Sequence, residues 1–163
     1  MRVEGKLKKD KKTKKLAKRI NAGEIALINH IDLDEVAAKS LVEAKIKLVI
    51  NAAESISGRY PNVGPSILMK ENILIIDNIV IIDNIGMEAF DILNEDDEIV
   101  VEDGIIYRSD KRIGSGQVMD AKLVVEKTRQ AYENLEVELD RFIDNTIEYA
   151  KKEKGLILGD VEI

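Results

Sequence analysis

Blocks of apolar residues alternate with polar stretches along the first 50 residues and predict a β-α-β unit. Continuous apolar runs predict buried strands at 24–28 and 45–50. Between them the apolar residues recur at helical spacing and share one face: Leu33, Val36, Ala37, Leu41 and Ala44. Asp32 is the expected N-cap of this helix, because Glu35 follows three residues later as in a capping box. Two strands joined by a helix imply a parallel pair with a right-handed crossover.

Turn signals in the middle of the chain predict a hairpin and two short helices. The dipeptide Asp103-Gly104 separates two apolar runs, 98–101 and 104–107, which is the pattern of a β-hairpin. The other expected elements are short helices at 66–70 and 87–93 and an edge strand at 112–118. Together with the β-α-β unit, this mixture indicates an α/β domain with parallel core strands.

A tandem duplication of six residues lies between the two short helices. Ile75-Ile76-Asp77-Asn78-Ile79-Val80 is followed directly by Ile81-Ile82-Asp83-Asn84-Ile85-Gly86. The two copies could extend one strand, form a tight hairpin, or leave one copy as a loop. Because both copies are apolar and β-branched, we expect this segment to be buried or paired.

The last part of the chain predicts one long helix over 120–154, which contains no Gly and no Pro. Two sets of residues repeat every seven positions and form a stripe of the a/d kind: Val125, Tyr132, Leu139 and Thr146, with Thr128, Leu135, Phe142 and Tyr149. Such a helix, about 30 residues long, would span roughly 45 Å. It could pack across the domain, serve as a rigid connector, or pair with a second copy of the chain.

Composition limits the class of protein. Apolar residues make up 45% of the 163 positions and aromatic residues only 4%, so an aliphatic core is expected. The chain has no Cys, which excludes disulfides and thiolate metal sites and fits a reducing compartment. No signal peptide and no apolar run of about 20 residues is visible, so a cytoplasmic location without a membrane span is predicted.

Charge is unevenly distributed along the chain. Residues 1–20 contain ten Lys/Arg and two acidic residues, a net of +8, whereas the remainder carries a net of −14. We expect residues 1–20 to form a basic arm that packs beside the acidic body. Such an arm could also bind an anionic membrane surface. Nucleic acid is not an expected partner, because the arm has no aromatic residue on which bases could stack.

The polar loop after the second strand is the candidate binding site. It holds two serines, a glycine, an arginine and a tyrosine just before a helix start, a combination suited to a phosphate or carboxylate. The candidate ligand-binding residues are Ser55, Ser57, Gly58, Arg59, Tyr60 and Asn62. No Gly-Lys-Ser/Thr follows, so this is not a P-loop. The alternative is a structural turn in which Arg59 pairs with an acidic residue.

Other titratable residues carry weaker signals. His30 is the only histidine, and we expect it to hydrogen-bond to the backbone at a strand end. Five aspartates match no calcium-loop spacing and are attributed to turns: Asp77, Asp83, Asp96, Asp97 and Asp103. We therefore expect no catalytic residue, no metal and no cofactor.

Several strings of the sequence, taken together, resemble the N-terminal region of the SteA-like cytokinetic-ring proteins. The most specific is Ser55-Ile56-Ser57-Gly58-Arg59-Tyr60-Pro61-Asn62, and the others are Thr13 to Arg19, Gly23 to Ala26, His30 to Asp34, Asn51 to Ala53, Asp83 to Gly86, Asp103-Gly104 and Asn145 to Tyr149. The resemblance covers nearly the whole chain. It implies that a thiamin-pyrophosphokinase-like domain and membrane segments would follow, with 155–163 as the start of a linker.

The order of elements is also similar to the swivelling phosphohistidine domain of phosphoenolpyruvate-utilising enzymes. That family places a catalytic histidine in the polar loop, where this chain has Arg59, Tyr60 and Pro61. The resemblance therefore implies the architecture without phosphohistidine transfer. The resulting fold expectation is a compact swivelling-type β/β/α domain over 21–118, with the long helix at 119–154.

Two functions follow as hypotheses. The first is a non-catalytic regulatory or interaction module of a bacterial division protein. It would bind a partner or a small anion through the loop and form homo-oligomers through the long helix. The second is an accessory domain of a thiamin-pyrophosphokinase-like enzyme that handles nucleotides or diphosphates. In that case Ser57 and Arg59 would contact phosphate in the neighbouring domain, and the full-length protein could be membrane-associated.

Overall fold

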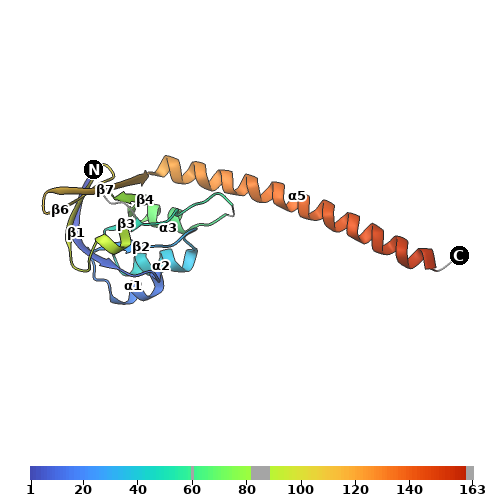
Figure 1. Ribbon diagram of the computed structural model, residues 1–163, viewed down its shortest axis with the longest axis horizontal. Helices are drawn as coiled ribbons and strands as arrows, with labels where there is room; N and C mark the ends of the chain where they lie inside the picture. The colour runs from blue at the N-terminus through green and yellow to red at the C-terminus, as the bar shows by residue number, and fades with distance from the viewer. Residues whose placement is uncertain (60, 82–88, 161–163) are drawn as a thin grey trace.

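Seven strands close into a barrel, and one long helix leaves it (Figure 1). The computed structural model describes residues 1–59, 61–81 and 89–160. The strands are β1 (Arg2–Lys9), β2 (Ile25–Ile28), β3 (Leu48–Asn51), β4 (Leu74–Ile81), β5 (Glu98–Glu102), β6 (Ile105–Arg108) and β7 (Lys111–Met119). The helices are α1 (Thr13–Arg19), α2 (Glu35–Glu43), α3 (Gly64–Lys70), α4 (Ala89–Ile92) and α5 (Ala121–Asp160).

The barrel has a parallel half and an antiparallel half, in the order β1-β2-β3-β4-β7-β6-β5. Strands β1 to β4 run parallel, whereas β7, β6 and β5 join antiparallel and return to β1. The predicted hairpin is β5–β6, with Asp103 and Gly104 at positive φ of 50° and 80°. The predicted α/β fold with parallel core strands, a β-hairpin and a long C-terminal helix is confirmed.

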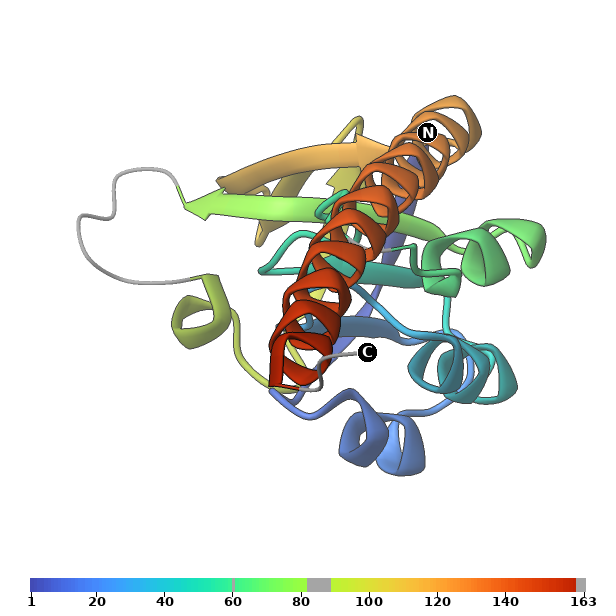
Figure 2. The same ribbon diagram turned by 90° about the vertical axis from the view of Figure 1, so that its right-hand side faces the viewer.

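The parallel strands separate two apolar cores. Alternate residues of β2 show this, because Ile25 and Leu27 point into the barrel while Ala26 and Ile28 face the helices. Helices α1, α2 and α3 cover that outer face and lie on the same side of the barrel (Figure 2). The all-apolar strands predicted from the sequence are thus buried on both faces, as parallel strands usually are.

The basic N-terminal segment is part of the domain, which corrects the expectation of an arm over residues 1–20. Strand β1 pairs with β2 on one side and β5 on the other, and Leu7 is fully buried inside the barrel. Helix α1 then inserts Leu16 into the outer core. The alternation of Val3, Gly5 and Leu7 with charged residues is a strand pattern that the density of lysines masks in the sequence.

Two local expectations are corrected. The N-cap of α2 is Asp34 and not Asp32, since the Asp34 carboxylate accepts a hydrogen bond from the Ala37 N–H at 2.7 Å. Strand β7 is not an edge strand, because it pairs with both β4 and β6 and closes the barrel. In the duplicated segment, β4 contains the first copy and continues to Ile81, whereas 82–86 lie outside the described residues.

Helix α5 packs on the domain only through its first turns. Val124 and Ala131 are buried, and Leu135 is half-buried, but every residue described from 136 to 153 is exposed. The helix has 40 residues, about 60 Å, and most of this length projects beyond the barrel (Figure 1). The predicted helix is confirmed, but it continues to Asp160, which corrects the expectation that a linker starts at 155. In the described part of the chain, no helix has the length and apolar character needed to cross a membrane.

Candidate functional site

The polar loop between β3 and α3, residues 52–63, is anchored at its start by Asn51. The Asn51 side chain is fully buried and bridges two strand ends. Its Oδ1 accepts from the N–H of His30 at 3.1 Å and of Ala53 at 3.0 Å, and its Nδ2 donates to the carbonyl of His30 at 2.9 Å and to Ser55 Oγ at 2.7 Å. All four hydrogen-bonding positions of the amide are therefore used, which holds the loop rigidly on the sheet.

Ser55 and Asp77 form a buried pair beneath the loop. The Ser55 N–H donates to Asp77 Oδ2 at 2.9 Å and its hydroxyl donates to Oδ1 at 2.6 Å, with both side chains fully buried. Burial raises the pKa of Asp77, and the two hydrogen bonds from Ser55 oppose that rise. The geometry corrects two expectations: Asp77 lies inside β4 and not in a turn, and Ser55 has a structural role instead of facing a ligand.

Ser57 makes a second pair of the same kind nearer the surface. Its N–H donates to Asp32 Oδ1 at 2.7 Å and its hydroxyl to Asp32 Oδ2 at 2.8 Å. Asp32 has a positive φ of 51°, so the side chain turns back toward the loop instead of capping α2. The Arg59 N–H in turn donates to Ser57 Oγ at 3.3 Å. The donors that the sequence offered to an anion are thus largely engaged by this carboxylate.

Asn62 closes the loop. Its Nδ2 donates to the carbonyls of Leu33 at 2.9 Å and Ser55 at 2.8 Å, and its Oδ1 is buried without a hydrogen-bond partner in the described part of the chain. Tyr60 lies outside the described residues. The Asn62 side chain thus points to the inside of the loop and ties the loop to the segment before α2.

The outer end of the loop meets α5. The Asn134 side chain donates to the carbonyl of Gly58 at 2.7 Å, and Gly58 has a φ of +86° that an L-residue adopts only with strain. Lys127 Nζ, also on α5, lies 3.4 Å from Glu54 Oε1. These two contacts fix the direction in which α5 leaves the barrel, because each joins the loop to the first turns of the helix.

A shallow pocket of about 470 Å³ lies where the loop and α5 meet. Its lining residues are Ser57, Gly58, Arg59, Asn134, Val137 and Glu138. Arg59 is exposed, and among the described residues its guanidinium forms no ion pair, so the alternative in which it pairs with an acidic residue is not observed. Arg59 is the cation among the described lining residues of this pocket, and Glu138, the acidic residue there, pairs with Arg141 at 3.2 Å.

His30 lies at the end of β2, on the side of the domain that carries α1. Its Nδ1 is 2.9 Å from Thr13 Oγ1, and its Nε2 is 3.6 Å from Asp34 Oδ2. The ring is therefore bound to a side-chain hydroxyl and not to the backbone, which corrects the sequence expectation. In the described residues no cluster of three His, Cys, Asp or Glu is arranged to hold a metal ion.

Sequence reasoning missed the residues that organise the loop, namely Asn51, Asp32 and Asp77. A signal for two of them was present, because Asn51 and Asp77 directly follow the strand runs Leu48-Val49-Ile50 and Ile75-Ile76. A polar residue in or at the end of an otherwise apolar strand needs a buried partner. Neighbouring parallel strands bring such residues together on one side of the sheet.

Ser55→Ala should destabilise the fold in a pH-dependent way. Without the Ser55 hydroxyl, the ionised Asp77 carboxylate loses one hydrogen bond, which lowers the free energy of unfolding by about 1–3 kcal/mol. Without this hydroxyl the pKa of Asp77 rises further. The loss in the free energy of unfolding is therefore full while Asp77 is ionised, and it shrinks as the pH falls toward 3.8, the ordinary aspartate value. Urea unfolding at neutral and at mildly acidic pH measures this.

Ser40→Ala is the matched control for this prediction. The Ser40 hydroxyl donates to the carbonyl of Val36 at 2.9 Å and faces no carboxylate. The loss in the free energy of unfolding caused by Ser40→Ala should therefore be the same at both pH values. Equal deficits for Ser55→Ala as well would show that Asp77 does not respond to the Ser55 hydroxyl.

Comparisons with known proteins give one similar solved structure. No family model matches the sequence, and no curated protein matches it. Among solved structures, 3-isopropylmalate dehydratase (LeuD) from Methanocaldococcus jannaschii is similar, with a TM-score of 0.48 and 11% sequence identity. The match covers 86% of this chain and 99% of that one. At this level the similarity carries no argument about function.

Proposed function

We propose that this chain is a non-catalytic interaction module that associates with a second copy of itself through α5. The observation that carries the proposal is the exposed apolar stripe on the projecting part of that helix. The stripe consists of Leu139, Phe142, Ile143, Ile147 and Tyr149, and exposed Tyr132 precedes it on the part of α5 that packs on the barrel. A row of exposed apolar side chains along one helix is typical of an association site.

The exposure of the stripe supports the proposal. Phe142 is 66% exposed and Tyr149 65%, well beyond the part of α5 that packs on the barrel. Large apolar side chains so exposed on a projecting helix lose their contact with water only if another molecule covers them. A single helix in water also has little stability of its own, because most helical stability in proteins comes from the packing of an apolar face.

The spacing of the stripe favours a second copy as the occupant. Leu139 and Thr146 occupy positions of the a kind, and Phe142 and Tyr149 positions of the d kind, which is the seam of a coiled coil. Such a seam is self-complementary, as a twofold-symmetric interface requires. Charged residues border the seam, among them Glu138 and, several turns later, Lys152. In two antiparallel copies, Glu138 of one helix could pair with Lys152 of the other.

Hydrogen exchange measured at several protein concentrations tests the proposal. Amides of residues 139–153 should be protected at high concentration and exchange fast after dilution, because the partner that stabilises this part of α5 is lost. The first turns of α5, which pack on the barrel, are the internal control and should not change. Fast exchange of 139–153 at every concentration would refute the proposal.

We further infer that the module belongs to a division-associated protein of the SteA-like type. The support is the resemblance of the sequence, most specifically the string from Ser55 to Asn62. A division-protein partner and a role as accessory domain of a thiamin-pyrophosphokinase-like enzyme are proposals on the same basis. Co-purification of the full-length protein with division proteins from a Gram-positive cell tests the first of these.

Binding of a small anion at the loop remains a second candidate function. Exposed Arg59 beside the pocket of about 470 Å³ favours it, whereas the engagement of Ser57 by Asp32 and the presence of Glu138 oppose it. Inorganic phosphate should raise the unfolding temperature of the natural chain and not of Arg59→Ala. Arg112→Ala, at an exposed position on β7, is the matched control. Equal shifts in all three proteins would exclude this function.

A further inference from the structure

We propose that the surface formed by α1 and the start of α2 docks onto an anionic lipid bilayer. Two features meet on this surface: a cluster of lysines without acidic partners and two exposed aliphatic side chains. We call it the lysine surface, and its basic members are Lys11, Lys12, Lys14, Lys15 and Lys18. This proposal is independent of the association through α5, because it uses a different part of the domain.

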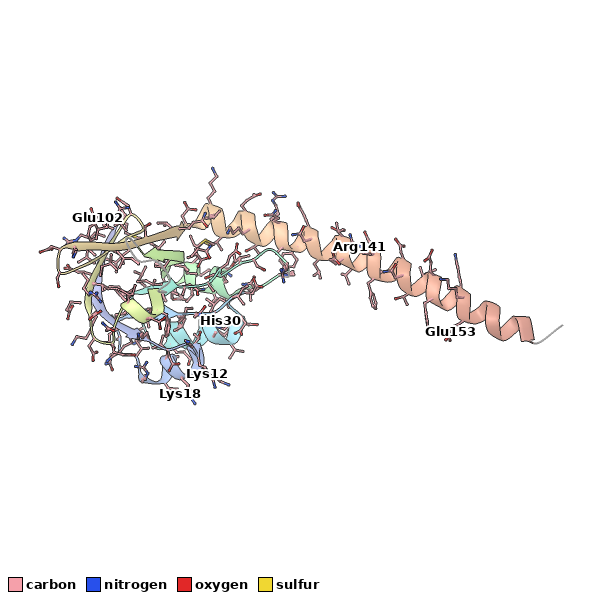
Figure 3. All side chains as sticks on the ribbon, in the orientation of Figure 1. Lys12, Lys18, His30, Glu102, Arg141 and Glu153 are labelled. Carbon is pink, nitrogen blue, oxygen red and sulfur yellow. The ribbon has the colours of Figure 1, made fainter. Side chains whose placement is uncertain are left out.

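The lysines are free to meet an external anion. All five are exposed, and in the described part of the chain none of them forms an ion pair. Arg19, the other cation of α1, differs because it pairs with Glu95 at 2.6 Å. Buried Leu16 and Thr13 hold α1 against the domain, so the lysines stand on a fixed base and project outward. Figure 3 shows Lys12 and Lys18 on the side of the domain away from Glu102.

The aliphatic residues lie beside the lysines. Ile31 is 61% exposed and Val36 is 62% exposed, and both line a hollow of about 620 Å³ together with Lys11, Lys12 and Lys14. Exposed aliphatic side chains next to lysines suit the boundary between lipid headgroups and acyl chains. The aliphatic groups enter the acyl region while the ammonium groups stay at the phosphates.

Acidic residues at the start of α2 do not cancel this charge. The Asp34 carboxylate caps the helix at the Ala37 N–H and lies 3.6 Å from the His30 ring, and Glu35 pairs with Lys39 at 2.6 Å. Asp10 is a third carboxylate here, and its Oδ1 accepts from the Lys12 N–H at 3.0 Å. Counting Lys39 with the five lysines, six cations stand against three carboxylates, so the surface keeps a net positive charge. Each lysine near an anionic leaflet adds about fivefold to the binding constant.

The composition favours a bilayer over a nucleic acid. The unpaired cations of this surface are all lysines in the described part of the chain, and lysines act as point charges. The ring of Phe90 lies 6.0 Å from Lys11 Nζ, but it is buried and so offers no face on which a base could stack. Lysine charge together with aliphatic insertion is what a lipid surface recognises. Nucleic acid is therefore kept as an alternative outcome of the test.

A fluorescent label at position 31 tests the proposal directly. Because the chain has no Cys, Ile31→Cys gives a single labelling site, and Glu102→Cys gives a control site on the far side. With vesicles of phosphatidylcholine containing about 30% phosphatidylserine, the label at 31 should shift to the blue and the label at 102 should not. Vesicles of phosphatidylcholine alone should shift neither.

Charge variants give the second measurement. Lys14→Gln with Lys18→Gln should weaken vesicle binding on the order of twentyfold, whereas Lys111→Gln with Lys122→Gln, the same charge change elsewhere, should change it little. Added salt should weaken binding of the natural chain as the Debye length shrinks. No blue shift at position 31, equal effects of the two double variants, or tighter binding to duplex DNA than to these vesicles would each overturn the proposal.

Discussion

Phe142→Glu is expected to abolish the proposed dimerisation of this chain through α5. Phe142 is 66% exposed and lies at a d-type position in the middle of the stripe, more than a full helical turn beyond the contacts with the barrel. In a paired helix this side chain would be covered by the second copy. A carboxylate in its place would be buried twice, once from each copy, without a counter-charge. We expect the dimer dissociation constant to rise by about a hundredfold or more.

The fold of the monomer should be unaffected by this change, because Phe142 is exposed and lies beyond the turns of α5 that pack on the barrel. Val137→Glu is the matched control: Val137 is 55% exposed on the same helix, lies on the opposite side from the stripe, and gains the same charge. Size-exclusion chromatography with light scattering compares the three proteins. If Phe142→Glu and Val137→Glu dimerise equally well, the stripe is not the interface.

Gly64→Ala is expected to cost the domain about 3 kcal/mol of stability. A Cβ at position 64 would lie 2.1 Å from the carbonyl oxygen of Leu33 and 2.8 Å from that of Asp34, far inside van der Waals contact. Both neighbours are backbone atoms of the segment that leads into α2, so no side chain can move aside. Helix α3 would have to retreat from that segment, and the loop held between them would loosen.

Urea unfolding of Gly64→Ala measures the cost, with Ser66→Ala as the control. Ser66 lies on the same helix and its hydroxyl forms no hydrogen bond in the described part of the chain, so its loss should change stability by at most about 0.5 kcal/mol. A Gly64→Ala protein as stable as the natural one would mean that α3 and the segment before α2 are less closely packed than described.

The elements most accurately predicted from the sequence are those with one unbroken pattern. The apolar runs of β2 and β3, the Asp103-Gly104 turn and the heptad pattern of the C-terminal helix each carry a local signal that tertiary contacts do not override. Strand β1 was missed because its lysines point outward from a half-buried strand and dominate the composition. Its membership of the barrel depends on β5, which lies about 90 residues later in the chain.

The candidate loop was located from its residue types, but its role could not be predicted from them. Ser55, Ser57 and Arg59 suit an anion equally well whether or not an internal carboxylate occupies the serines. Asp32 and Asp77 occupy them, and only the packing of three parallel strands brings these aspartates beneath the loop. The outer end of the loop contacts α5 through Gly58 and Glu54.

Sedimentation equilibrium of the natural chain is the most direct test of the central claim, that α5 is a self-association surface. At concentrations up to about 100 µM, we expect a mass twice the 18.3 kDa of one chain, falling toward a single chain on dilution. A mass of 18.3 kDa at every concentration would contradict it.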